Sequence, residues 1–189
     1  DYIGIMWPDS IPVFASQDRC VYEDGKECTE IVVNDNAVDV ETDLLRYNPI
    51  TAEELNDIVA PLFGFNSLPI TTTVIGYAAS CFLRPILKTV GIKHGSLLLI
   101  GESGSGKSTT LDEVVRPIFG CGTPVSAADL TEASLRFGIG SSNSIPFVIE
   151  EYKQAKLNKE NINSICNALR NNYDQTMARK CSTSNSIIE

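Results

Sequence analysis

The sequence predicts an α/β fold with a parallel sheet, on the evidence of two short apolar runs and the helical patterns around them. Residues 97–100 (LLLI) and 146–149 (PFVI) are too short for helices and are typical of strands buried on both faces of a sheet. Helices are expected over 107–118, from Ser126 onward with Asp129 at the third position, and over 159–171 with Asn158 as the cap. Strand, helix, helix, strand and helix in this order indicate an α/β arrangement.

The composition is that of an ordinary soluble globular chain. The 189 residues are 43% hydrophobic and 21% charged, which excludes disordered, collagen-like and disulfide-scaffold classes. The formal net charge of −9 argues against a protein that coats nucleic acid with its whole surface. The acidity is concentrated in residues 1–60, which carry net −11, whereas residues 61–189 carry net +2. The second part of the chain could therefore still contact a phosphate backbone.

The cysteines and the single histidine give no metal pattern. Six cysteines are scattered without a Cys-x-x-Cys pair, and His94, expected on the surface or in a loop, is the one histidine, so a structural zinc site is not expected. The pattern favours reduced thiols and a cytoplasmic location. The chain begins with Asp1 and carries no signal segment, so we expect a piece of a longer protein. The uncharged stretch 64–83 is too polar for a membrane span, and we expect a buried helix there.

The first half of the chain divides into two predicted segments ahead of the core. Residues 1–48 form an acidic β-rich segment, the end of a preceding domain, with short strands near 3–7, 13–14, 20–22 and 31–33. Residues 49–92 form a helical region. Its first helix begins at Thr51, which has capping-box spacing to Glu54, and Ile50 with Leu55 has the spacing of a hydrophobic staple.

The second helix of this region is expected to follow Pro69, to bend or stop near Pro85 and to end by Gly91. Residues 93–189 form the predicted core, which we expect to be truncated at its C-terminus.

A phosphate-binding pattern lies between the first apolar run and the next helix. Residues 101–108 read GESGSGKS and satisfy G-x-x-x-x-G-K-[ST], in the strand–loop–helix context that the pattern requires. Glycines let backbone N–H groups converge on phosphates, and the helix starting at Lys107 adds the positive end of its dipole. Lys107 would contact the β- and γ-phosphates, and the Ser108 hydroxyl would ligate Mg²⁺. The predicted nucleotide-binding residues are Gly101, Glu102, Ser103, Gly104, Ser105, Gly106, Lys107, Ser108 and Thr109.

Two carboxylates follow the second apolar run, where an ATPase of this kind needs them. We assign Glu150 to the metal and Glu151 to the attacking water, as general base. The first position is more commonly Asp, so a shifted register is an open alternative. The plainer alternative is that both acids face solvent at the end of a strand.

With both motifs given, the stretch from about residue 50 onward resembles the superfamily-3 helicases, the AAA+-like hexameric motors of viral replication proteins and of phage and mobile-element primase-helicases. The helical region before the first strand, GESGSGKST at 101–109 and FVIEEYK at 147–153 carry the resemblance. It implies a P-loop NTPase core that uses ATP and Mg²⁺, a homo-oligomeric ring and single-stranded DNA as partner, without a membrane. A looser likeness runs to bacterial mobile-element proteins with a threonine-bearing helix before the second motif, as around Thr131 here.

The resemblance also extends to a basic segment near the C-terminus. Residues 153–180 hold six bases against two acids, and the family places basic residues from such a segment in its central channel. Arg179 and Lys180 are the preferred DNA contacts, and an ordinary solvated helix face is the alternative. Thr183–Asn185 spells the family's sensor triplet but follows no apolar strand, so we expect the sensor and the arginine finger outside this chain.

These observations favour the ATP-hydrolysing core of a DNA replication helicase from a virus, phage or mobile element. Two other functions stay open. One is a P-loop ATPase of a mobile-element or defence system that does not translocate on DNA. The other is a nucleotide-gated assembly module without hydrolysis.

Overall fold

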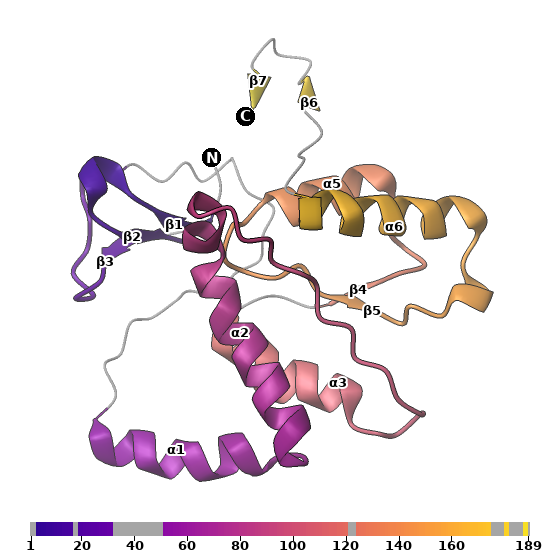
Figure 1. The fold of residues 1–189 in the computed structure, drawn as a ribbon, viewed down its shortest axis with the longest axis horizontal. Coiled ribbons are helices and arrows are strands. Elements are labelled where there is room, and N and C mark those ends of the chain that lie inside the picture. The colour runs from indigo at the N-terminus through magenta and orange to yellow at the C-terminus, as the bar shows by residue number, and fades with distance from the viewer. Residues whose placement is uncertain are drawn as a thin grey trace.

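The computed structural model describes residues 3–16, 19–31, 51–120, 124–174, 180–181 and 187–188. Its fold is mixed α/β, with a three-stranded antiparallel sheet, a two-stranded parallel sheet and helices between and beside them. In Figure 1 the antiparallel sheet lies at one side of the molecule, the long helix α2 runs through the middle, and α5 and α6 lie together at the opposite side.

The N-terminal sheet pairs β1 (Gly4–Met6), β2 (Val13–Ala15) and β3 (Cys20–Tyr22) in the order β1-β2-β3, and the short helix η1 (Pro8–Ser10) connects the first two. A turn follows β3, in which the Gly25 N–H donates to the Tyr22 carbonyl and Gly25 takes a φ of 77°. The strands predicted near 3–7, 13–14 and 20–22 are confirmed. The strand predicted over 31–33 falls largely outside the described residues.

Contacts with residues 141–144 attach this sheet to the rest of the molecule. The Ile3 N–H donates to the Ser141 carbonyl over 2.9 Å. The side chain of Asn143 bonds both backbone groups of Ile5: its Oδ1 accepts from the N–H over 3.0 Å and its Nδ2 donates to the carbonyl over 2.8 Å. Gly4 has a φ of 140°, and a Cβ there would lie 1.8 Å from the Asn143 Oδ1, so this attachment requires glycine.

Two helices lie in the next described part of the chain, which begins at residue 51. Helix α1 (Ala52–Gly64) begins with the predicted capping box, in which the Glu54 N–H donates to the Thr51 hydroxyl over 3.2 Å and the Glu54 carboxylate accepts from the Thr51 N–H over 2.8 Å. Ile50, the other half of the predicted staple, lies outside the described residues. Helix α2 (Leu68–Thr89) continues through Pro85 without stopping, and Gly91 follows it in the left-handed region.

The helix expected over 64–83 is confirmed by α2, but the expectation that it is buried holds for one face only, since Leu68 and Leu83 are exposed. Val74, Ala78 and Cys81 on this face belong to the main hydrophobic cluster. Within the described residues, α2 is the one helix long and apolar enough to cross a membrane, a test that core helices of soluble proteins also pass.

The helix predicted over 107–118 is confirmed as a continuous helical run. It consists of α3 (Lys107–Thr110), a π-helical segment η2 (Leu111–Val115) and α4 (Arg116–Phe119). Gly120 ends the run with a φ of 59°, as glycine after a helix commonly does.

The parallel sheet is shorter than predicted. β4 (Val125–Ser126) pairs with β5 (Ile149–Glu150), so the strand predicted over 146–149 forms only at its last residue and extends into Glu150. The prediction of a helix from Ser126 is wrong, because Ser126 lies in β4. Helix α5 (Glu132–Gly140) instead begins after Thr131, whose hydroxyl accepts from the Ser134 N–H.

The last predicted helix is confirmed. Helix α6 (Lys159–Asp174) follows the short helix η3 (Gln154–Lys156), and the Asn158 side chain accepts from the Asn161 N–H over 2.7 Å, as a cap does. Two further strands, β6 (Lys180–Cys181) and β7 (Ile187–Ile188), pair antiparallel.

The strand predicted over 97–100 is absent from the described structure. Residues 92–102 run without regular secondary structure between α2 and α3. Leu97 and Leu99 pack against the main cluster, whereas Leu98 is 66% exposed and Ile100 is 85% exposed. The physical reason is that no described strand lies beside this segment to accept its backbone hydrogen bonds and cover its second face.

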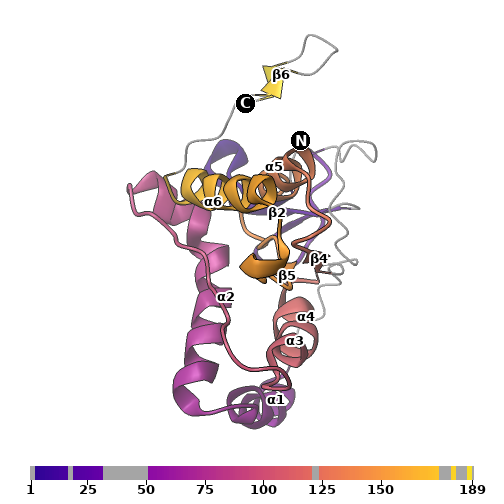
Figure 2. The ribbon, with the colours of Figure 1, turned by 90° about the vertical axis from the view of Figure 1, so that its right-hand side faces the viewer.

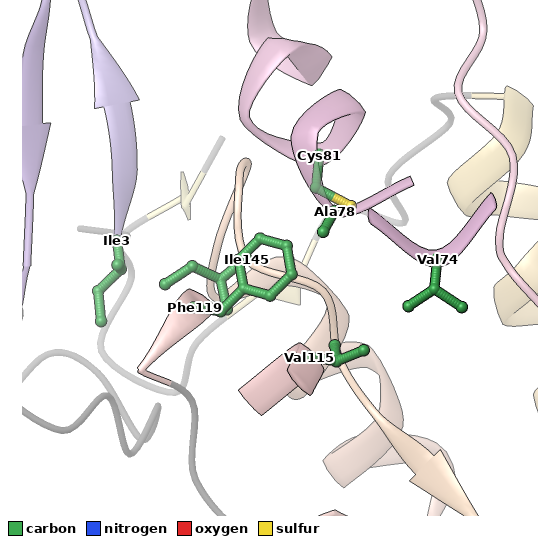
Figure 3. Close-up of a cluster of buried hydrophobic side chains, with 7 residues drawn as sticks. All are labelled: Ile3, Val74, Ala78, Cys81, Val115, Phe119 and Ile145. Atoms are coloured by element: carbon green, nitrogen blue, oxygen red, sulfur yellow. The ribbon is translucent and has the colours of Figure 1, made fainter. Parts of the chain in front are cut away.

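Two hydrophobic cores position the elements around the predicted nucleotide loop. The main core joins α2, the 107–119 helix and Ile3 from the start of the chain, with Phe119 fully buried and stacked on Phe82. Figure 3 shows Ile3, Phe119 and Ile145 between β1 and α2. The second core joins α5 and α6 to the parallel sheet through buried Leu135 and Ile165, and Figure 2 shows these two helices side by side. The predicted domain boundaries stay predictions, although Ile3 contributes to the core of the helical part.

Candidate nucleotide site

The glycines of the 101–106 loop take backbone conformations that other residues rarely adopt. Gly104 has a φ of 78° and Gly106 a φ of 81°, both in the left-handed region. Gly106 is the residue immediately before α3, so its conformation directs the chain into the helix. The Ser105 N–H donates to the Glu102 carbonyl over 3.3 Å and closes the turn. The backbone therefore favours glycine at Gly106, a glycine of the motif, and at Gly104 within it.

The ammonium group of Lys107 folds back over the loop that precedes it. Its Nζ donates to the Gly101 carbonyl over 2.8 Å, to the Glu102 carbonyl over 2.5 Å and to the Ser105 hydroxyl over 3.1 Å. These three oxygen atoms thus hold the Lys107 ammonium against the loop. Lys107 is half-buried, whereas Gly101 to Ser105 are exposed, so the site is open to an incoming anion.

The backbone amides around the start of α3 are available to a ligand. Among the described residues the structure records no acceptor for the N–H groups of Gly104, Gly106, Lys107 and Ser108. The first N–H groups of a helix have no partner within the helix, and they carry the positive end of its dipole. The Thr110 hydroxyl donates to the Gly106 carbonyl over 2.8 Å and fixes the first turn. Exposed Ser108 and Thr109 lie on this turn.

Glu150 is the last residue of the half-buried strand β5 (Ile149–Glu150). Its backbone carbonyl accepts from the Ala127 N–H over 2.9 Å within the parallel sheet. Its Oε1 is buried and has no hydrogen-bond partner in the part of the chain that the structure describes. A buried carboxylate oxygen without a donor is costly unless a cation or a proton satisfies it. The group therefore fits the predicted metal contact.

Glu151 differs from Glu150 in both backbone and exposure. It has a φ of 56°, which is uncommon for a residue with a Cβ and stores strain. Its side chain is 69% exposed, and the Lys153 Nζ lies 3.8 Å from its carboxylate. The left-handed backbone turns the chain out of β5 directly after Glu150. Glu151 therefore presents its carboxylate to solvent.

The loop residues form one contiguous group, and the two glutamates form a second group. In Figures 1 and 2 the loop before α3 lies toward the lower end of the molecule, whereas β5 lies higher, beside β4. Between Ser108 or Lys107 and the two glutamates, the described residues make no hydrogen bond or ion pair. No cluster of three or more His, Cys, Asp or Glu side chains that could hold a metal occurs among the described residues. Mg²⁺ at nucleotide sites commonly takes only one or two protein ligands plus phosphate oxygens, a set that Ser108 and Glu150 fit.

The predicted nucleic-acid contacts are only partly described. Arg179 lies outside the described residues, and of Lys180 only the backbone, in β6, is described. On α6, Lys159 and Arg170 are exposed and, eleven positions apart, lie on one face of the helix. Exposed Tyr173 lies near the same face. We call the two bases Lys159 and Arg170, together with the neighbouring Tyr173, the basic stripe of α6.

A polar cluster behind the loop segment is not evident from the sequence. The His94 Nε2 lies 2.7 Å from the Ser80 hydroxyl, and the centroid of its ring lies 5.3 Å from that of Tyr77. The Ser80 hydroxyl donates its one hydrogen to the Tyr77 carbonyl, so Nε2 acts as the donor to Ser80. His94 is thus half-buried, not simply a surface residue. Burial, with Arg84 nearby, lowers the pKa of His94 below its ordinary value.

A second contact joins the same segment to α6. The Lys93 Nζ lies 2.6 Å from the Asp174 carboxylate and 4.9 Å from the centroid of the Tyr173 ring. Together with the His94 contact, it fixes the segment that leads into the loop. Pairs so far apart in the chain leave no local pattern from which they could be found.

Comparisons with known proteins add no relative. The family models, the curated proteins and the solved structures each contain no match to this chain.

Proposed function

We propose that this chain is an ATP-binding and Mg²⁺-dependent ATP-hydrolysing core, and that it serves as part of a DNA replication helicase. The observation that carries the proposal is the environment of Lys107. Its ammonium is held by two loop carbonyls and a hydroxyl at the start of a helix, next to two glycines in the left-handed region. Such a loop offers an anion a charge, free amides and a helix dipole at once.

Phosphate oxygens are better acceptors for Lys107 than the carbonyls that it now contacts, because they carry charge. On binding, the ammonium would exchange the carbonyls of Gly101 and Glu102 for phosphate. The amides of Gly104, Gly106 and Ser108 would donate to the same group. This exchange needs only a side-chain rotation, since the helix that begins at Lys107 is already formed.

The metal contact would come from Ser108 and Glu150. A bound Mg²⁺ would neutralise charge on the β- and γ-phosphates. Glu150 supports this role because its buried Oε1 has no donor among the described residues. The Ser108 hydroxyl is exposed on the first turn of α3, beside the amides assigned to the phosphates.

The base role falls to Glu151, whose exposed carboxylate follows Glu150 directly. A carboxylate oxygen can act as general base and accept a proton from the attacking water. Lys153, 3.8 Å away, would compete for the carboxylate until the site closes. Closure by a neighbouring subunit in a homo-oligomeric ring is part of the proposal and comes from the resemblance to superfamily-3 helicases.

The helicase part of the proposal rests on that resemblance and on the basic stripe of α6. Two exposed bases on one helix face with a tyrosine nearby suit phosphate contacts and base stacking on single-stranded DNA. Arg179 and Lys180 stay the contacts proposed from the sequence. The cytoplasmic location stays an expectation of the sequence.

Steady-state ATP hydrolysis at low salt, with and without single-stranded DNA, tests the proposed function. Measurements use the wild-type protein, with the Lys107→Ala variant as the blank. We expect lysine-dependent turnover that single-stranded DNA stimulates. Turnover that depends on Lys107 but is not stimulated by single-stranded DNA would instead favour a P-loop ATPase that does not translocate on DNA. Turnover equal to the blank would favour a nucleotide-gated module.

A further inference from the structure

Two cysteines lie opposite each other in the N-terminal sheet. Beyond β3, residues 26–28 return antiparallel to the strand: the Tyr22 N–H donates to the Lys26 carbonyl over 2.9 Å, and the Cys28 N–H donates to the Cys20 carbonyl over 2.8 Å. A bridge between Val21 and Glu27 lies between these two bonds. The register therefore sets Cys20 directly across from Cys28.

Both thiols point into the same buried cluster. Opposite residues of an antiparallel pair share a face, and Val13, Ala15, Cys20 and Cys28 form one hydrophobic cluster. Cys20 is 1% exposed and Cys28 is 3% exposed, and both are free thiols. Cα atoms of hydrogen-bonded opposite residues lie about 5.5 Å apart. This value falls within the range of about 4.4–6.8 Å that disulfides span.

We propose that Cys20 and Cys28 are a redox-convertible pair, which a small-molecule disulfide such as oxidised glutathione links into an intramolecular disulfide across the two strands. One cysteine sulfur attacks the glutathione disulfide, forms a mixed disulfide and releases one glutathione thiolate. The second cysteine sulfur then attacks the mixed disulfide and releases the other glutathione. Two electrons pass to the reagent, and the two thiol protons pass to solvent or to the released thiolates.

Formation of the disulfide should be slow, and among the described cysteines it should link only this pair. Burial raises the pKa of the Cys20 thiol, so little thiolate is present at neutral pH. The reagent must also wait for local opening of the three-residue edge 26–28. Cys166 on α6 is exposed and should react earlier, as a single thiol that takes up glutathione. Once formed, the disulfide would covalently hold one edge of the N-terminal sheet. Ile3, which directly precedes strand β1 of this sheet, belongs to the main core.

Peptide mapping tests the proposal directly. The native chain is incubated with oxidised glutathione, its remaining thiols are alkylated, and it is digested with trypsin without reduction. Cleavage after Arg19, Lys26 and Arg46 separates the two cysteines into peptides 20–26 and 27–46. We expect these peptides to be recovered as one linked species that separates on reduction. Their recovery as two alkylated or glutathione-bearing peptides, after Cys166 has fully reacted, would overturn the proposal.

A control variant and a second measurement keep the test independent of folding defects. Cys81→Ala removes a buried thiol of the main hydrophobic cluster and should leave the Cys20–Cys28 disulfide intact. Loss of this disulfide in the Cys81→Ala variant would overturn the assigned pairing. In the wild-type chain, the linked form should melt about 5 °C above the reduced form, since the link constrains the unfolded chain. An equal or lower melting temperature would mean that the native hairpin does not accommodate the bond and would also overturn the proposal.

Discussion

The ammonium nitrogen of Lys107 lies 2.5 Å from the backbone carbonyl oxygen of Glu102, five residues before it in the chain. The lysine of the predicted phosphate site thus bonds the backbone of its own loop. Because backbone carbonyls are weaker acceptors than phosphate, this contact is readily exchanged.

Replacing Glu151 separates its chemical role from its backbone strain. Glu151→Gln should retain nucleotide binding and lose turnover, because an amide cannot accept the proton of water. Glu151→Gly should lose turnover too, but it should raise the free energy of unfolding by about 1 kcal/mol, since glycine tolerates the φ of 56°. ATPase assays and urea unfolding measure the two effects. Retained turnover in Glu151→Gln would move the base role to another residue.

Replacing Glu150 tests its proposed contact with the metal. Glu150→Gln removes a charge whose Oε1 is buried without a partner among the described residues, so stability should rise or stay equal. The same change should increase the Mg²⁺ concentration needed for half-maximal turnover by about 10-fold or more. Metal titrations of the ATPase rate check this. An unchanged Mg²⁺ requirement would show that Glu150 does not contact the metal.

His94 predicts a specific dependence of stability on pH. Burial and Arg84 lower its pKa in the folded chain, so the unfolded chain binds more protons as the pH falls through the ordinary value of 6.5. The folded state should therefore lose stability from about pH 7 downward. His94→Gln keeps an N–H donor for Ser80 but does not titrate, and it should remove this part of the pH dependence. Identical pH profiles of the two proteins in urea unfolding would contradict the prediction.

The basic stripe of α6 predicts a charge effect on DNA binding. Lys159→Glu together with Arg170→Glu should weaken binding to single-stranded DNA and reduce its salt dependence, because fewer counterions are released. Arg136→Glu on α5 is a matched control, since Arg136 already pairs with Glu132. Fluorescence anisotropy at several salt concentrations measures both. If Arg136→Glu weakened DNA binding equally, the change in net charge alone would explain the effect and the stripe would not be a DNA contact.

The features that the sequence predicts correctly are those decided by local chemistry. Thr51 and Asn158 cap their helices because the side chain and the N–H that it accepts are three residues apart. Strand β3 and its turn follow from a short apolar run next to a glycine. The helix after Lys107 is likewise local, and Gly120 ends it.

The features that the sequence misses depend on distant partners. Residues 97–100 have the composition of a two-sided buried strand, but a strand forms only beside another strand, and none lies there in the described structure. Asn143 bonds Ile5 across 138 positions of the chain, and no local pattern reveals such a pair. The candidate site shows the same difference. The loop is a local sequence pattern and could be predicted from it. That Glu150 Oε1 is buried without a hydrogen-bond partner among the described residues could be seen only in the structure.

Calorimetric titration of Mg-ATP tests the central claim most directly, with the wild-type chain, Lys107→Ala and Lys156→Ala compared. Lys156 is an exposed lysine outside the loop and serves as the matched control. The account predicts that Lys107→Ala keeps the melting temperature but loses ATP affinity by about 100-fold or more, while Lys156→Ala binds as the wild type does. Equal affinity in Lys107→Ala and wild type would contradict the assignment of residues 101–109 to the phosphates.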